Sequence, residues 1–134
     1  MCCEEIYIYM GKFVVKHTKT GIKFDLKATN GQVIATSEVY NSKDACMNGI
    51  ESVKKNSAVA QVEDQTVENF EKQKHPKFQV FKDKAGEFRF NLTAKNGQII
   101  AVSEGYKTMV NCIGGVESVI SNAPDAPVEE LADQ

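Results

Sequence analysis

Residues 30–56 read NGQVIATSEVYNSKDACMNGIESVKKN, and residues 96–122 repeat this stretch as NGQIIAVSEGYKTMVNCIGGVESVISN. The two copies align without a gap at a constant offset of 66 residues, so that residue 30 corresponds to residue 96. A match of this length and regularity indicates a tandem duplication rather than chance. The chain is therefore expected to consist of two copies of one structural unit.

The length of the chain suggests that the two copies share one hydrophobic core. The chain has 134 residues, and a unit of about 65 residues is near the lower limit for burying an adequate core alone. We therefore expect a single pseudo-twofold domain over residues 1–134. It would be built from repeat 11–64 and repeat 77–131, with a charged linker at 65–76.

The overall charge gives no sign of a nucleic-acid or membrane partner. The net charge is −2 and the sequence pI is near 5.7, which leaves no electrostatic footprint for polyanions. No apolar run approaches the length of a membrane span. The chain starts Met-Cys-Cys-Glu-Glu, without the cationic and apolar regions of a signal peptide. We expect a cytoplasmic protein.

The four cysteines are of two kinds. Cys46 and Cys112 occupy equivalent repeat positions, and we expect them to be small buried apolar residues. Cys2 and Cys3 are adjacent at the start of the chain, where an exposed pair is the simpler interpretation, and metal binding or oxidation is the alternative. No Cys-x-x-Cys spacing is present, so neither a metal site nor a cofactor is predicted.

Alternating apolar residues predict three strands in each repeat before the helix. The dipeptides Asn30-Gly31 and Asn96-Gly97 are typical of a two-residue type I′ hairpin, in which both residues have positive φ. A two-residue loop would place Ile34 and Ile100 on the face of the sheet opposite the core. The third strand of each repeat would then be apolar on both faces.

Each third strand is followed by a predicted helix and a short final strand. Ser42 and Thr108 are expected to be N-caps of helices over 43–55 and 109–121. The apolar residues of each helix form one stripe, and a glycine in the middle of each stripe indicates close contact with a neighbouring backbone. Asn56 and Asn122 are expected to be left-handed C-caps. Residues 60–64 and 126–130 match each other and predict the final strands.

The recurring Ser-Glu-x-Tyr motif is the most plausible functional feature. Neighbouring residues on a strand point to opposite faces, so Ser and Glu cannot form a nucleophile–base pair there. His17 and His75 lie at non-equivalent positions outside the motif, so no catalytic triad is indicated and we predict that the chain is not an enzyme. The alternative is that Ser and Glu stabilise the strand end and Tyr closes the core. The candidate interaction patch adds apolar residues of the second helix and comprises Ser37, Glu38, Tyr40, Ser103, Glu104, Tyr106, Met109, Val110 and Ile113.

Two kinds of binding function remain open. Surplus apolar surface on the second repeat favours a non-catalytic module that binds a protein partner or a second copy of the chain. The alternative is nucleic-acid binding by the first hairpin, which carries a cluster of lysines: Lys12, Lys16, Lys19, Lys23 and Lys27. The aromatic residues of this hairpin fit the core better than an outward stacking surface, so nucleic acid is the less favoured partner.

The pattern F-x-V…G-x-x-F-x-L-x-A-x-N-G-Q-x-I-A-x-S-E-x-Y…G-[IV]-E-S-V-x-x-N resembles the YegP-like family, bacterial proteins that share domain of unknown function 1508. The resemblance covers two tandem copies from residue 12 to about residue 130. It implies an α+β fold of two β-β-β-α-β repeats. Their final strands would be exchanged within one antiparallel sheet, with the helices packed on one face. The resemblance implies no activity, cofactor or ligand.

Overall fold

The computed structural model describes residues 11–131. Cys2, Cys3 and the β-rich segment 5–10 lie outside the described residues, as do residues 132–134. Each repeat contributes three strands, one helix and a final short strand. The elements are β1 (Lys12–His17), β2 (Ile22–Lys27), β3 (Val33–Thr36), α2 (Lys43–Ser57), β4 (Gln61–Asp64), β5 (Lys77–Lys82), β6 (Phe88–Thr93), β7 (Ile99–Val102), α3 (Met109–Asn122) and β8 (Val128–Glu130).

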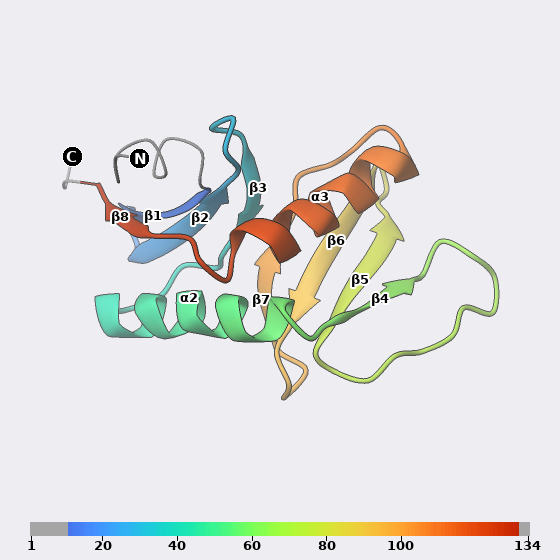
Figure 1. The fold of residues 1–134 in the computed structure, drawn as a ribbon, viewed down its shortest axis with the longest axis horizontal. Coiled ribbons are helices and arrows are strands. Elements are labelled where there is room, and N and C mark those ends of the chain that lie inside the picture. The colour runs from blue at the N-terminus through green and yellow to red at the C-terminus, as the bar shows by residue number, and fades with distance from the viewer. Residues whose placement is uncertain (1–10, 132–134) are drawn as a thin grey trace, which may run out of the picture.

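One eight-stranded sheet contains both repeats, in the order β4-β5-β6-β7-β3-β2-β1-β8. The repeats meet where Thr36 of β3 pairs with its own counterpart, Val102 of β7, which places the pseudo-twofold axis between these strands. The final strands are exchanged, since β4 lies beside β5 and β8 lies beside β1 (Figure 1). Both of these edge pairs are parallel. The sheet is thus mixed rather than wholly antiparallel, because each helix crosses to the other repeat before its final strand pairs.

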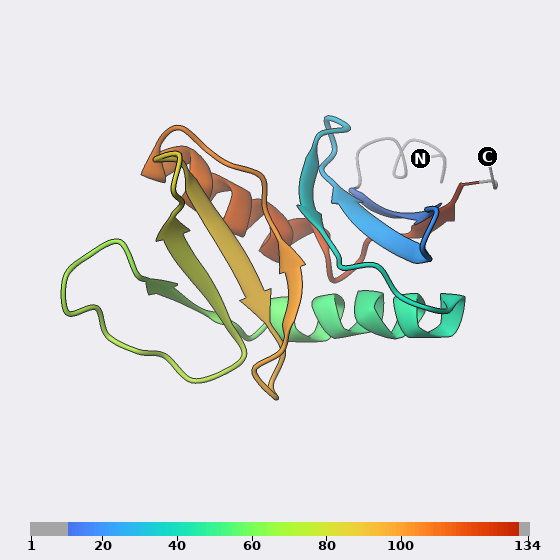
Figure 2. The same ribbon diagram turned by 180° about the vertical axis from the view of Figure 1, so that it is seen from behind.

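Both helices cover one face of the sheet, as expected (Figures 1 and 2). The core between the helices and the sheet is built on four fully buried phenylalanines: Phe13, Phe24, Phe78 and Phe90. They form two equivalent edge-to-face pairs, with ring centroids 5.6 Å apart in the first repeat and 5.8 Å apart in the second. The duplication therefore extends to the packing of the core.

The Asn-Gly hairpins differ from the expected type I′ turn. Gly31 has φ of 84°, whereas Asn69 is the only non-glycine residue with positive φ in the described segment 11–131. Ala28 N–H donates to Gln32 O and Gly31 N–H donates to Ala28 O, both at 2.9 Å. This pattern defines a three-residue loop, a type I turn closed by a left-handed glycine with a bulge.

The bulge brings one further residue of each third strand to the core side. The register shifts between Leu26 and Lys27, so Lys27 pairs with Val33 while Leu26 still pairs with Ala35. Ile34 and Ile100 were expected on the opposite face. They join the core instead, with 6% and 7% of their surface exposed. The prediction that the third strands are apolar on both faces is therefore wrong at these positions.

The helices begin as predicted and end later. Ser42 Oγ accepts from Ala45 N–H, and Thr108 Oγ1 accepts from Asn111 N–H, each at 3.1 Å, which confirms both N-caps. Asn56 lies inside α2 and donates from Nδ2 to Ser52 O at 2.8 Å. The prediction of left-handed C-caps at Asn56 and Asn122 is wrong. Each asparagine side chain donates a hydrogen bond back to its own helix, and the C-cap residues are Ala58 and Ala123, both in the right-handed helical conformation.

A carboxylate–lysine pair joins each exchanged strand to the other repeat. Glu63 of β4 meets Lys77 of β5 at 2.7 Å, and its counterpart Glu129 of β8 meets Lys12 of β1 at 2.5 Å. The two pairs differ in burial. The side chains of Glu63 and Lys77 are 1% and 9% exposed, whereas those of Glu129 and Lys12 are 48% and 44% exposed. The Glu63–Lys77 pair is covered by the loop that joins β4 to β5, and Gln73 N–H of this loop donates to Glu63 Oε1.

Candidate functional site

The two serines of the Ser-Glu-x-Tyr motifs point inward and stabilise the sheet. Ser37 Oγ accepts from Phe24 N–H at 2.9 Å and donates to Glu38 O at 2.7 Å. Ser103 repeats both bonds with Phe90 N–H and Glu104 O. Both hydrogen-bonding directions of each hydroxyl are thus taken by the backbone, which gives these serines a structural role.

The tyrosines of the motif pack between the sheet and a helix. Tyr40 stacks on Phe24 with ring centroids 6.3 Å apart and planes 11° apart. A Cβ added to Gly49 of α2 would lie 2.3 Å from the Tyr40 hydroxyl oxygen, and the equivalent contact joins Gly115 to Tyr106. The mid-helix glycines were expected to face a backbone. They accommodate a tyrosine side chain instead.

The remaining residues of the predicted patch are only partly available. Glu38 and Glu104 are exposed, and Val110 is 80% exposed. Met109 and Ile113 pack against the core, although part of each side chain remains accessible. The structure therefore does not bring the nine predicted residues together into one exposed surface.

The two described cysteines are buried, as expected, and their environment suppresses thiol reactivity. Burial, followed by the nearby Asp64 carboxylate, raises the pKa of Cys112 to about 11. Burial, with a smaller contribution from Glu130, also raises the pKa of Cys46. Because the thiolate is the nucleophile and the metal ligand, neither thiol is prepared for chemistry at neutral pH.

The lysines of the first hairpin are largely neutralised by carboxylates. Asp25 is 4% exposed and meets Lys16 at 2.6 Å and Lys23 at 3.6 Å. Burial raises the pKa of Asp25, but the Lys16 contact and the Thr36 hydrogen bond outweigh it, so the pKa is lowered. Lys12 is paired with Glu129. The hairpin thus offers less free positive charge than the sequence indicates.

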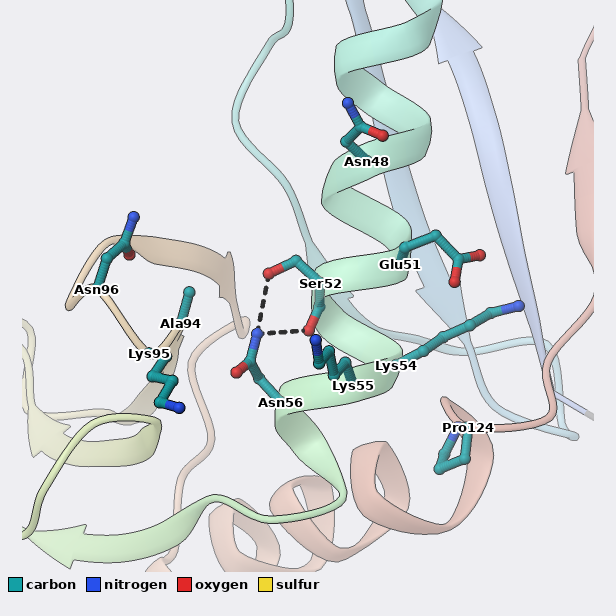
Figure 3. A pocket seen from close by; sticks show the side chains of 10 residues that line it. All are labelled: Asn48, Glu51, Ser52, Lys54, Lys55, Asn56, Ala94, Lys95, Asn96 and Pro124. Carbon is teal, nitrogen blue, oxygen red and sulfur yellow. Dashed lines mark hydrogen bonds between the residues drawn. The ribbon is translucent and has the colours of Figure 1, made fainter.

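An open groove of about 750 Å³ lies between α2 and the turn that joins β6 to β7 (Figure 3). The helix belongs to the first repeat and the turn to the second, so this groove exists only because the repeats are packed together. Its lining contains several amide and ammonium groups. The lining residues are Asn48, Glu51, Ser52, Lys54, Lys55, Asn56, Ala94, Lys95, Asn96 and Pro124.

Lysines dominate the charge of this groove. Lys54 and Lys55 lie in the last turn of α2, and Lys95 lies on the β6–β7 turn. None of the three forms a salt bridge within residues 11–131. Glu51 is the one carboxylate in the lining. The groove therefore presents three ammonium groups whose charge is balanced locally by a single carboxylate.

The pseudo-twofold axis relates this groove to a second one, of about 380 Å³, between α3 and the β2–β3 turn. Ser118 and Asn30 line it, as Ser52 and Asn96 line the first. The lysines are not repeated. The 66-residue offset places Ile120, Ser121 and Thr29 at the positions of Lys54, Lys55 and Lys95. The two grooves thus occupy equivalent places in the fold but differ in size and in charge.

Sequence reasoning missed this groove because its residues come from different repeats. The available signal was the contrast between Lys54-Lys55 and Ile120-Ser121 in the alignment of the repeats. Only the packed structure shows that Lys95 lies across the groove from this pair.

Residues 11–131 hold no cluster of three histidine, cysteine, aspartate or glutamate side chains placed to bind a metal ion. No helix in this described part of the chain is long and apolar enough to cross a lipid bilayer.

The fold and this surface define a class of protein: a tandem-repeat α+β domain with exchanged final strands and grooves formed between its repeats. The chain belongs to the family described as a domain of unknown function, DUF1508, whose model matches residues 19–64 and 83–130. The YegP-like resemblance is thereby confirmed.

Three relatives show how the family is built. A UPF0339 protein of Pseudomonas aeruginosa is 38% identical over 120 residues, which cover 89% of this chain and 96% of the relative. A UPF0339 protein of Treponema denticola is 53% identical over 55 residues, 41% of this chain and 95% of the relative, so it is about one repeat long. The solved structure of yegP from E. coli, described as a protein of unknown function, has a TM-score of 0.73 and 33% identity. It matches over 90% of this chain and 92% of its own. None of these names assigns an activity.

Proposed function

We propose that the chain is a non-catalytic, cytoplasmic binding module that holds a partner protein in the groove between α2 and the β6–β7 turn. The observation that carries this proposal is the contrast between the two pseudo-equivalent grooves. One is lined by Lys54, Lys55 and Lys95, which have no salt-bridge partner within residues 11–131, whereas the equivalent positions near the other groove hold neutral residues. A ligand that occupies one groove would account for this difference.

The chemistry of the inward-facing groups supports a binding role rather than catalysis. The motif serines use their hydroxyls to bond the backbone, and the raised pKa values of Cys46 and Cys112 keep the thiols protonated. The polar groove residues are three lysines, three asparagines, a serine and one glutamate, which are groups that hold a ligand through hydrogen bonds and charge.

The helix dipole offers a purely structural explanation for part of this pattern. Lysines in the last turn of a helix stabilise it by about 0.3–1 kcal/mol each, and Lys54 also lies over the Phe13 ring at 5.8 Å. This explanation does not extend to Lys95, which lies on a turn. It also does not explain why α3, a helix of 14 residues, has no basic residue in its last turn. Ligand binding accounts for all three lysines together.

Nucleic-acid binding by the first hairpin is less well supported. Lys12, Lys16 and Lys23 already contact carboxylates, so they would release few counterions on binding a phosphate backbone. The aromatic residues of this hairpin, Phe13 and Phe24, are fully buried and offer no stacking surface.

Capture of a partner from extracts of the source organism tests the proposal. The immobilised protein would be compared with the double variant Lys55→Glu/Lys95→Glu, after nuclease treatment and at two salt concentrations. The matched control is Thr29→Glu/Ser121→Glu, which introduces two glutamates at the pseudo-equivalent positions. We expect a protein that is retained by the wild type and the control and lost by the groove variant. The proposal would be refuted if the groove variant retained the protein as well as the wild type does, if only nucleic acid were captured, or if nothing were captured.

A further inference from the structure

We infer that the partner contacts this protein through an extended acidic segment, which lies in the α2 groove and continues over the linker to Lys72 and Lys74. This inference rests on the proposed function and adds the chemical nature of the contacting segment. Three features of the described residues carry it: the charge of the groove, the closeness of the linker to the groove, and the way the lysines of the groove are spread.

Two further lysines lie on the loop between β4 and β5, which also carries Glu68 and Glu71. Lys72 and Lys74 of this loop are exposed and form no salt bridge within residues 11–131. They line a second hollow of about 390 Å³ with Val59, which follows the end of α2. Figure 1 shows this loop on the same side of the molecule as the end of α2 and the β6–β7 turn.

A direct contact joins the end of the linker to the β6–β7 turn. The ring of His75 lies 3.3 Å from the position that a Cβ would take on Gly97 of the β6–β7 turn. His75 Nδ1 is 2.8 Å from Thr93 Oγ1, so the ring is held against the second repeat. The end of the linker, which follows Lys72 and Lys74, is therefore held beside the turn that carries Lys95.

The arrangement of the lysines favours a ligand with several separated charges. Figure 3 shows Lys54 and Lys95 extending to opposite sides of the end of α2, with Lys55 between them. A single phosphate or carboxylate cannot contact ammonium groups that diverge in this way. A chain with carboxylates at intervals can, and the side-chain amides of Asn48 and Asn96 provide donors and acceptors for its backbone.

The lining distinguishes an acidic peptide from a nucleic acid. Sequence-tolerant binding of single strands combines positive charge with aromatic side chains on which bases stack. Neither hollow has a phenylalanine, tyrosine or tryptophan among its lining residues. Carboxylates need only ammonium and amide partners, which this surface has. The occupant that fits is thus an acidic, extended protein segment.

Fluorescence anisotropy with a defined probe tests the inference. The probe is a labelled peptide of about a dozen glutamate and serine residues, about 40 Å long when extended. The comparison ligands are the same peptide with glutamine for glutamate, a single-stranded oligothymidine of similar length, and inorganic phosphate as a competitor. We expect the acidic peptide to bind most tightly and to weaken as salt rises.

Four variants locate the binding path. Lys55→Glu/Lys95→Glu and Lys72→Glu/Lys74→Glu should each weaken peptide binding by about tenfold, since each reverses two exposed charges along the path. Thr29→Glu/Ser121→Glu, at the pseudo-equivalent positions, should leave binding unchanged. Glu51→Gln should tighten binding, because it removes the one carboxylate of the lining. Urea unfolding of each variant shows whether the fold is intact.

The outcomes separate this inference from the function on which it rests. If the linker variant binds like the wild type, the segment does not cross the linker and the inference is wrong. If oligothymidine binds more tightly than the peptide, or phosphate displaces the peptide at low concentration, the acidic-segment assignment is also wrong. If no peptide binds but a protein is still captured through the groove, the proposed function stands and its partner has a different chemistry.

Discussion

Glu63 provides the sharpest test of how the exchanged strands are held. Its carboxylate is 1% exposed and accepts three hydrogen bonds: from Lys77 Nζ at 2.7 Å, from Gln73 N–H at 2.8 Å and from Gln65 Nε2 at 2.7 Å. These donors lie on β5 and on the loop that covers the pair. Replacing Glu63 with glutamine removes the charge while keeping the size of the side chain, so it isolates the contribution of the ion.

The expected magnitude follows from the pKa of this carboxyl group. Burial raises the pKa, but the bonds from Lys77, Gln65 and Gln73 outweigh it and lower the pKa from 4.5 to about 2. One pKa unit corresponds to about 1.4 kcal/mol, so the ionised form stabilises the fold by up to about 3 kcal/mol at neutral pH. Because the folded-state pKa is the lower one, this contribution is complete above pH 4.5. It is lost as the pH falls from 4.5 towards 2.

Urea unfolding at several pH values between 7 and 2 measures this contribution as the difference between wild type and Glu63→Gln. We expect the variant to be less stable at pH 7, by about 2–3 kcal/mol, and the difference to shrink as the pH falls towards 2. The matched control is Glu129→Gln at the equivalent exposed pair with Lys12, where solvent screening leaves a much smaller effect. An equal loss in both variants, or a difference that does not depend on pH, would refute the reasoning.

Three further predictions follow from contacts in the second repeat. Gly115→Ala should destabilise the fold by more than about 1 kcal/mol, because its Cβ would lie 2.3 Å from the Tyr106 hydroxyl oxygen. Gly114→Ala should stabilise the fold by up to about 1 kcal/mol, because no atom of the described residues lies within 4 Å of the added Cβ. Thermal unfolding of both variants compares the two effects. Ser103→Ala should cost about 1–3 kcal/mol in urea unfolding, since Phe90 N–H loses its partner, without changing peptide affinity. Cys112, with its pKa near 11, should react with a thiol reagent only as fast as the protein unfolds, and rapid labelling of the folded chain would contradict this.

The order of the elements was predictable because it depends on local patterns that occur twice. Ser42 and Thr108 were recognised as N-caps from the residues around them, and both bonds are present. The final strands at β4 and β8 were visible as a short match after each helix. Their exchange between repeats was implied by the family resemblance, because nothing in a single strand specifies which neighbour it pairs with.

The hairpin turns were not predictable from the Asn-Gly dipeptide. This dipeptide fits a type I′ turn, but it also fits a type I turn followed by a left-handed glycine. The second arrangement turns Ile34 into the core beside Ala35, and the gain in apolar burial selects it. The Glu63–Lys77 pair was missed for a similar reason. Its residues become neighbours only after a strand of one repeat joins the sheet of the other.

The duplication within one chain gives a physical reason why the two grooves can differ. The Treponema denticola relative is about one repeat long. Any symmetric assembly of such a chain would form each groove from the same residues, so every groove would carry the same charge. In the duplicated chain, Lys54 and Ile120 are encoded separately, as are Lys95 and Thr29. One groove can therefore become cationic while the other keeps the neutral residues and the shared packing. Charge that is confined to one of two equivalent grooves is the difference on which the proposed binding role rests.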